Sequence, residues 1–302
     1  MRWEWSREPH AGIIRVRSTR PARGTPVKHP EPPLTLSPAA FRVRLLTLAG
    51  VALLGAVPLA AHGPIPQDPA YHHFRDDRTL LGVPNALNVL SNLPFLLLGV
   101  WGLWFLARHG APRPDGPFLT SGERWPYTVL FVGVLTTCLG SMYYHLDPTD
   151  ARLVWDRLPM TVGFMGLFAS IVAERIGPRV GDLLLSPLVA AGAASVAYWY
   201  GTEQQGRGDL RPYILVQFYP LAAVVVMGLL FPPRYTRGAW LFAGLGLYVL
   251  AKVCEDADAR ICGRGGVVSG HTLKHLPAAG GWCVLRMLQT RRPARGRAKG
   301  PP

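Results

Sequence analysis

Long apolar segments alternate with short polar loops along most of the chain from residue 41 onward. There are eight such segments, and each is near the ~20 residues that an α-helix needs to cross ~30 Å of hydrocarbon. They cover residues 41–63, 88–108, 126–145, 154–173, 182–200, 212–231, 238–253 and 271–289. The pattern predicts an all-α integral membrane protein, in which 238–253 is the shortest span.

The first apolar segment, 41–63, allows two interpretations. A basic region, an apolar run and an end of small residues together resemble a cleavable signal peptide. The preceding residues, 1–40, are rich in Arg and Pro and show little periodicity, which is typical of a disordered tail and is long for a signal sequence. We therefore favour an uncleaved transmembrane helix or signal anchor over 41–63, preceded by a disordered basic tail.

The composition also favours a membrane protein. Hydrophobic residues make up 49% of the chain and charged residues only 17%, whereas a soluble protein carries about 25% charge. The net charge of +14 would suit nucleic acid, but the basic residues gather beside apolar segments and in the two tails, 1–40 and 291–302. No zinc finger or RNP motif accompanies them, so we expect the lipid bilayer and not nucleic acid as the partner.

Basic and acidic loops alternate in a way that predicts the topology. Arginines occur in the N-terminal tail, near 108–124, 175–179 and 234–237, and in the C-terminal tail, while acidic residues gather in the intervening loops. Because Lys and Arg stay on the cytoplasmic side, we expect eight spans with both termini in the cytoplasm. The high Arg, Ala, Gly and Pro content is in keeping with a bacterial inner membrane.

Polar side chains converge at the outer ends of three predicted spans: Ser141, His145, Asp156, His271 and His275. Ser141 and His145 are four residues apart and so share a helix face, as do His271 and His275. Each has an ordinary alternative: an interfacial histidine, an aspartate that caps a helix or a serine bonded to backbone. Their common depth favours a functional site, because ionisable groups in a bilayer are costly and usually face the bundle interior.

This set of side chains suits zinc-dependent hydrolysis. His145, His271 and His275 would leave one tetrahedral position of a zinc ion open, as in catalytic sites, where a bound water is acidified to a pKa near ~7. Asp156 would act as general base and general acid. Ser141 would stabilise the oxyanion of a tetrahedral intermediate.

Another interpretation makes Ser141 a nucleophile with His145 as its base. No nucleophile elbow precedes this serine, and the two histidines of GHTLKHL, residues 270–276, would then have no role. Lys274, between those histidines, is expected on another helix face as a bystander.

The stretch GSMYYHLDPTDARLVWDRLPM, residues 140–160, followed by GHTLKHL, resembles the alkaline ceramidases. It is also similar to their wider superfamily of seven-helix membrane hydrolases, which includes the adiponectin-receptor-like proteins. The shared pattern is a Ser four residues before a His, an Asp eleven residues after that His, and a C-terminal HxxxH. The resemblance covers about residues 70–290. It implies a seven-helix core, to which the helix over 41–61 is an addition.

The resemblance also implies an activity, the hydrolysis of the N-acyl bond of a ceramide-like lipid to a long-chain base and a fatty acid. The implied zinc ligands are His145, His271 and His275, and the implied catalytic residues are Asp156 and Ser141. A non-enzymatic receptor-like or lipid-binding protein with a structural zinc is the alternative. Structural zinc usually has four protein ligands, and three histidines are evident here, which favours the enzyme.

Alkaline ceramidases carry an acidic, tryptophan-containing calcium site in the segment that corresponds to FRDDRTLLGVPNALNVLSN, residues 74–92. The oxygen-bearing side chains kept here are Asp76, Asp77, Asn85, Asn88 and Asn92. Hard oxygen ligands in a loop suit Ca²⁺, but the glutamates and the tryptophan of the family are missing. A Ca²⁺ site with Asp76, Asp77 and Asn85 as ligands and a turn-forming, helix-capping loop are the two alternatives.

Two residue pairs near the predicted site are further candidates. His72 and His73 are expected at the membrane interface, and a role at the rim of the site is the less favoured alternative. Cys254 and Cys262 share one short polar loop and would pair only if that loop faces an oxidising compartment.

Overall fold

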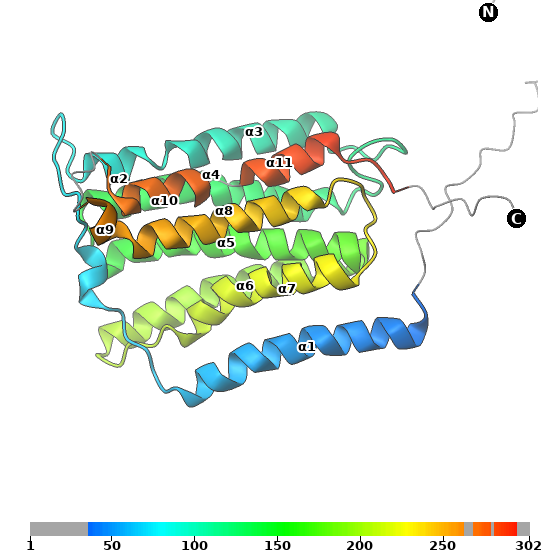
Figure 1. Ribbon diagram of the computed structural model, residues 1–302, viewed down its shortest axis with the longest axis horizontal. Coiled ribbons are helices and arrows are strands. Elements are labelled where there is room, and N and C mark those ends of the chain that lie inside the picture. The colour runs from blue at the N-terminus through cyan, green and yellow to red at the C-terminus, as the bar shows by residue number, and fades with distance from the viewer. Residues whose placement is uncertain (1–35, 263–267, 279–280, 295–302) are drawn as a thin grey trace, which may run out of the picture. The chain divides into compact units, whose positions relative to one another are not determined.

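The computed structural model describes residues 36–262, 268–278 and 281–294, which form helices and no β-strand (Figure 1). Residues 1–35 of the predicted tail, 1–40, and the C-terminal residues 295–302 lie outside these ranges. The N-terminal tail ends earlier than predicted, because α1 (Pro38–Ala61) begins after Ser37. The side-chain oxygen of Ser37 accepts a hydrogen bond from the backbone N–H of Ala40 at 3.2 Å and so caps the helix.

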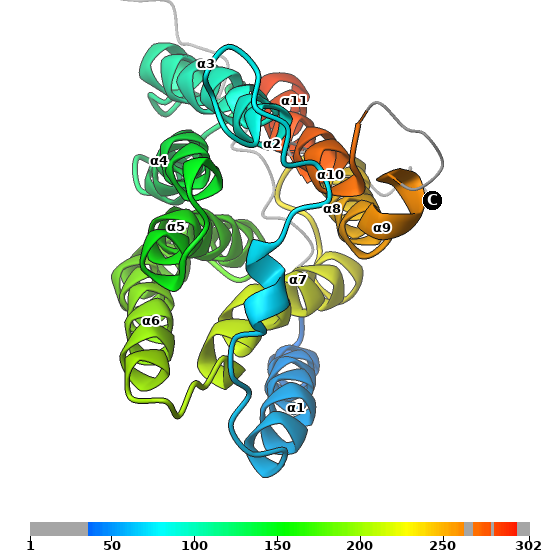
Figure 2. The same ribbon diagram turned by 90° about the vertical axis from the view of Figure 1, so that its left-hand side faces the viewer.

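The other helices pack as a bundle within the described ranges. In chain order they are η1 (Pro69–His72), α2 (Ala86–Leu90), α3 (Leu93–His109), α4 (Arg124–Leu146), α5 (Asp150–Arg175), α6 (Pro178–Gln204), α7 (Arg211–Leu230), α8 (Ala239–Asp256), α9 (Asp258–Cys262), α10 (Gly270–Ala278) and α11 (Gly281–Thr290). Helices α3 to α6 pack in sequence order, α7 packs against α5 and α6, and α8 packs against α10 and α11 (Figures 1 and 2). Helix α11 returns to α3, and α1 packs against α7.

Six helical segments are long and apolar enough to cross a membrane, which supports an integral membrane protein. They are Pro38–Ala61, Ala86–His109, Arg124–Leu146, Asp150–Arg175, Pro178–Gln204 and Arg211–Leu230. They correspond to the first six predicted spans, with ends that differ from the predicted ends by at most four residues. The second of them joins α2 and α3.

The last two predicted spans, 238–253 and 271–289, are not among these six. Helix α8 has 18 residues, and its last five include Lys252, Glu255 and Asp256. The final apolar segment is described as α10 and α11, of 9 and 10 residues, on either side of residues 279–280. An eight-span topology therefore stays a prediction.

Helices α4 and α5 lie close together because glycines occupy the places where their backbones meet. A Cβ atom on Gly140 would lie 1.8 Å from the carbonyl oxygen of Trp155, and one on Gly133 would lie 2.4 Å from the backbone nitrogen of Gly163. Small residues at such points let helix backbones approach. This contact places the C-terminal turns of α4 beside the N-terminal turns of α5.

The opposite ends of α4 and α5 enclose a buried charged cluster. Arg291, which the sequence analysis assigns to the basic tail, is only 1% exposed. Its Nη1 lies 3.3 Å from Oε2 of Glu174 and 3.0 Å from the hydroxyl oxygen of Tyr127. Its guanidinium also lies against the rings of Phe118 and Tyr235. The chain after α11 is thus anchored in the bundle, since a buried charge needs such partners.

Candidate metal centre

The three predicted zinc ligands come together in the structure. His145 lies in the last turn of α4, and His271 and His275 lie one turn apart on α10. All three side chains are buried, and one ligand nitrogen of each lies within 4.8 Å of the other two. They are therefore close enough together to bind one metal ion.

Local hydrogen bonds determine where α10 begins and hence where its histidines lie. The Oγ atom of Ser269 accepts a hydrogen bond from the backbone N–H of Thr272 at 3.0 Å, which is the pattern of an N-cap. The backbone N–H of His271 donates to Oδ1 of Asp258 at 2.8 Å. The hydroxyl of Thr272 donates to Oδ1 of Asn88 at 2.7 Å, which ties α10 to α2.

Ser91 orients the ring of His275. Its Oγ lies 2.7 Å from Nδ1 of His275 and 3.0 Å from the carbonyl oxygen of Asn88. The single hydroxyl hydrogen donates to that carbonyl, so Ser91 accepts from Nδ1–H of the imidazole. The Nε2 atom of His275 then carries the lone pair, which is the form that binds a metal.

Phe74 packs against the cluster. Its ring centroid lies 4.8 Å from that of His145 and 4.5 Å from that of His271. The apolar ring comes from the segment between η1 and α2, far from the histidines in sequence. It limits the access of water to one side of the group.

Asp156 and Ser141 lie beside the histidines. Asp156 is a buried residue in the second turn of α5. Thr149 caps this helix through its side-chain oxygen, so the alternative of Asp156 as the cap is wrong. Ser141 is buried on α4, four residues before His145 and so on the same helix face. Asp156, Ser141 and His275 line one cavity, so a carboxylate and a hydroxyl face the same space as a metal ligand.

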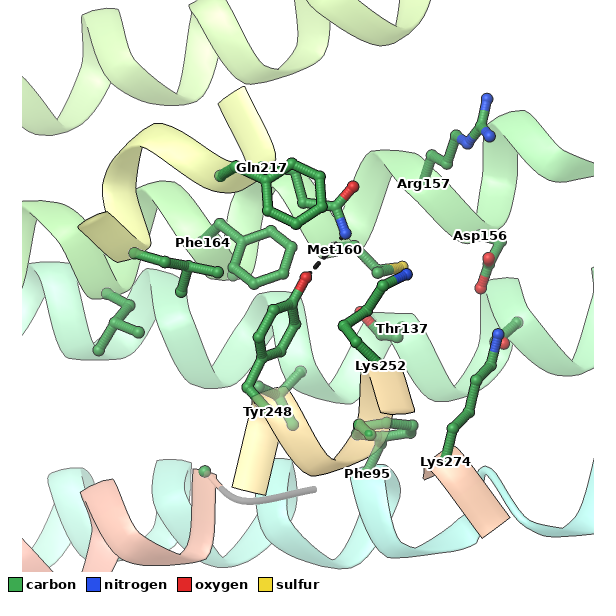
Figure 3. Close-up of a pocket in the computed structure, with 18 of the residues that line it drawn as sticks. Phe95, Thr137, Asp156, Arg157, Met160, Phe164, Gln217, Tyr248, Lys252 and Lys274 are labelled. Atoms are coloured by element: carbon green, nitrogen blue, oxygen red, sulfur yellow. Dashed lines mark hydrogen bonds between the residues drawn. The ribbon is translucent and has the colours of Figure 1, made fainter. Parts of the chain in front are cut away.

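This cavity has a volume of about 340 Å³ and is mostly apolar (Figure 3). Its lining on α4 reaches from Ser141 to Leu130, which is about 16 Å of helix. Phe164 contributes an apolar side chain from α5. Farther in, Nε2 of Gln217 donates to the hydroxyl of Tyr248 at 2.8 Å, the bond drawn in Figure 3. The cavity thus has a polar end at the site and a long apolar part within the bundle.

Lys274 lines the same cavity, so the expectation that it is a bystander is wrong. Its Nζ lies 2.7 Å from Oε1 of Glu255, and Lys252 pairs with the same carboxylate. Figure 3 shows both lysines extending from α8 and α10 toward α5, where Asp156 lies.

The donor set fits a metal ion. The Nδ1 atom of His145 and the Nε2 atom of His271 are buried and have no hydrogen-bond partner among the residues described. Buried polar atoms normally have a partner, so these two nitrogens are arranged for one. Within the described ranges, no fourth His, Cys, Asp or Glu joins the group. Three imidazoles with an open position are the ligand set of catalytic zinc.

The segment proposed for Ca²⁺ is tied into the fold by its polar side chains. Both carboxylate oxygens of Asp76 lie 2.7 Å from Arg78 nitrogens, and this guanidinium lowers the pKa of that carboxyl below its usual value. The side-chain amides of Asn88 and Asn92 donate to the carbonyl oxygens of Asp76 and Asn88. These bonds favour the turn-forming alternative.

Two other predicted calcium residues differ in exposure. The amide of Asn85 donates to the carbonyl oxygen of His145 at 2.9 Å, so it braces the metal-ligand end of α4. Asp77 is exposed. Binding of Ca²⁺ stays a prediction.

The remaining candidate pairs have different positions. His72 lies between Tyr144 and Asp150, with its two ring nitrogens 3.0 Å from the hydroxyl of one and a carboxylate oxygen of the other. His73 is exposed. Cys254 is a free cysteine in the structure, and the side chain of Cys262 lies outside the described part of the chain.

The sequence analysis did not single out four residues that the structure brings to the site: Phe74, Ser91, Arg157 and Glu255. Ser91 could have been found, because it is a polar residue near the start of the first core span and a ligating histidine needs a second partner. The charged residues lie at the ends of predicted spans, where arginine and glutamate are ordinary. Whether these side chains point into the cavity depends on how each helix is rotated about its own axis, and the sequence pattern does not reveal that rotation.

Comparisons with protein-family models, with curated proteins and with solved structures find no match to this chain. The functional conclusion therefore depends on the residues and on the geometry of the site.

Proposed function

We propose that the protein is an integral-membrane, zinc-dependent amidase that hydrolyses the N-acyl bond of a ceramide-like lipid. The products are a fatty acid and an amine such as a long-chain base. One observation carries the proposal: His145, His271 and His275 form a buried group, and two of their ring nitrogens have no hydrogen-bond partner among the residues described. This group lies beside a cavity that is also lined by Asp156 and Ser141.

Each polar side chain has a role in this reaction. Zinc held by the three histidines would supply a Lewis acid and an activated water. Asp156 takes a proton from the attacking water and returns it to the leaving amine. The Ser141 hydroxyl, which lines the same cavity as Asp156, donates to the oxyanion. The C–N bond breaks, the acyl carbon gains the oxygen of water and the nitrogen gains a proton.

The cavity and the helices support a lipid substrate. An apolar chain fits the long part of the cavity, while the amide remains at the polar end next to Ser141. The resemblance adds α8 and the α10–α11 segment to the core as further spans, which makes seven core helices and α1 an eighth. The distribution of arginines supports cytoplasmic termini and a site toward the extracytoplasmic side.

Metal analysis and lipid hydrolysis test the proposal together. We expect about one zinc per chain in the purified protein and much less in His271→Ala, while His73→Ala, at an exposed histidine, keeps it. We expect Asp156→Asn to keep zinc and lose about 10²-fold or more in kcat, since general acid–base catalysis contributes on that order. Asp147→Asn, at an aspartate with a 64% exposed side chain, is the matched control.

Three outcomes would contradict the proposal. Absence of stoichiometric zinc in the wild type rules out the metal centre. Bound zinc without amide hydrolysis, with lipid binding unchanged in Asp156→Asn, indicates the non-enzymatic alternative. Covalent labelling of Ser141 by a serine-directed probe, with activity that survives His271→Ala, indicates a serine nucleophile instead.

A further inference from the structure

The cavity beside the histidines is lined by more cations than carboxylates. Its charged lining residues are Arg157, Lys252, Lys274, Asp156 and Glu255. Three cations face two carboxylates, so one positive charge is left over. An acyl chain alone does not explain these charged side chains, because removing a charge from water costs free energy.

Arg157 has the features of an anion-binding residue. It is 6% exposed. One terminal nitrogen, Nη2, donates to Oε1 of Gln67 at 2.6 Å, while the other, Nη1, is buried without a hydrogen-bond partner in the described ranges. The rings of Trp199 and Tyr213 lie 4.1 and 4.7 Å from its guanidinium carbon. These rings stabilise the cation, but they do not neutralise it or accept the free N–H.

The two lysines add to the positive charge at this end of the cavity. Lys252 and Lys274 share one carboxylate, that of Glu255. Each ammonium group has three donors, so donors remain for another ligand. Figure 3 shows these lysines and Asp156 at the same part of the pocket, while Arg157 extends from the next position of α5 in a different direction.

We infer that Arg157 binds a carboxylate on the amine half of the substrate, so that the preferred lipid is an N-acyl amino acid and not a neutral ceramide. The inference rests on the proposed function for its reaction and names the substrate class. A carboxylate would pair with Arg157, whose Nη1 has no partner in the described ranges, and its oxygens suit the planar donors of a guanidinium. A phosphate, with about −1.5 to −2 charges, is the other anion to test against it.

The placement of the groups suits such a molecule. In an N-acyl amino acid the carboxyl carbon is two bonds from the amide nitrogen. Asp156 and Arg157 are consecutive residues that line the same cavity. Figure 3 shows the two side chains leaving α5 in different directions, so a substrate with its amide at Asp156 would direct its amine half along the cavity wall to bring the carboxylate to Arg157, while the acyl chain extends into the apolar part.

The test compares amide substrates that share a palmitoyl chain and differ in the amine half. N-palmitoylglycine, its neutral carboxamide, a palmitoyl ceramide and N-palmitoylethanolamine phosphate are given to the full-length protein in detergent micelles. We expect kcat/KM for the carboxylate to exceed that for the carboxamide by about tenfold or more, as expected for a hydrogen bond to a charged group. Arg157→Gln should lower this ratio about tenfold, mainly through KM.

Two matched variants accompany Arg157→Gln. Arg152→Gln, on the same helix but paired with Asp147 and absent from the cavity lining, should keep the wild-type ratio. Lys252→Gln should lower the ratio by about two- to threefold, because its side chain is 43% exposed. Arg157→Lys keeps the charge and loses the planar fork, and it should also lower the ratio. Arg157→Lys replaces Arg157→Gln in the test if Arg157→Gln does not fold. Zinc content is measured for every variant.

The outcomes separate this inference from the proposed function. If the wild type hydrolyses ceramide or the carboxamide as well as the carboxylate, or if the Arg157 variants keep the ratio, the inference is wrong and the amidase stands. Preference for the phosphate also overturns it. If no amide is hydrolysed, the proposed function fails. Binding then tests Arg157 alone. Two non-hydrolysable analogues are compared, in which a sulfonamide replaces the amide and the amine half carries either a carboxylate or a carboxamide. Equal affinities of the two analogues overturn the role of Arg157.

Discussion

Oγ of Ser91 lies 2.7 Å from Nδ1 of His275, a residue 184 positions later in the chain. The serine immediately follows α2, and the histidine belongs to α10 near the end of the described chain. The same hydroxyl donates to the carbonyl oxygen of Asn88, so its direction is determined. The first core helix therefore orients a metal ligand that the last helices supply.

Replacement of this serine tests its role as a partner of the ligand. We expect Ser91→Ala to weaken zinc binding by about 10- to 100-fold, because outer partners fix the ring orientation and tautomer of ligating histidines. Zinc transfer to a competing chelator measures the affinity. Ser170→Ala, at a buried serine that also donates to a backbone carbonyl, should leave the affinity unchanged. Equal affinities for Ser91→Ala and the wild type would contradict the prediction.

The contact between α4 and α5 should not tolerate a side chain at Gly140. A Cβ atom there would lie 1.8 Å from the carbonyl oxygen of Trp155. Because this oxygen belongs to the backbone of α5, the clash can be relieved only if the two helices move apart. We expect Gly140→Ala to destabilise the protein by about 1–3 kcal/mol or more, in the range for overpacking. Thermal unfolding in detergent measures the change.

A second glycine provides the control for that experiment. A Cβ on Gly246, within α8, would meet no atom within 4 Å. Gly246→Ala should therefore stabilise the helix by up to about 1 kcal/mol. Equal unfolding temperatures for the two alanine variants would show that α4 and α5 are not in close contact.

The pair of Asp209 and Arg211, between α6 and the start of α7, should make stability depend on pH. The Arg211 guanidinium, 2.8 Å from the carboxylate, holds the pKa of Asp209 at about 2. This is below the ordinary value of ~3.9. The stabilisation is therefore present above about pH 4 and is lost as the pH falls toward 2. We expect Asp209→Asn to be less stable than the wild type at pH 7, with a smaller difference at pH 3.

Urea unfolding at the two pH values measures this effect. Asp115→Asn, at an exposed aspartate, controls for the loss of one negative charge. A difference between Asp209→Asn and the wild type that is the same at pH 3 and pH 7 would contradict the assignment.

Much of the helical framework could be predicted from hydrophobic length alone. The six membrane-length segments were expected within a few residues, because a helix that crosses hydrocarbon must be apolar over about 20 residues. The charged end of α8 lowers the hydrophobicity of that segment, and its residues Lys252 and Glu255 line the cavity. The last segment is described as α10 and α11, on either side of residues 279–280.

The sequence by itself determined the helical membrane architecture and the three histidines that meet, since i,i+4 spacing and equal membrane depth are both readable along the chain. Only the tertiary structure decided that Ser91 holds His275, that Arg291 is buried and that Lys274 faces the cavity. The physical reason is that these contacts depend on how each helix is rotated about its axis. That rotation is set by packing between residues far apart in the chain, as in the approach of Gly140 to Trp155.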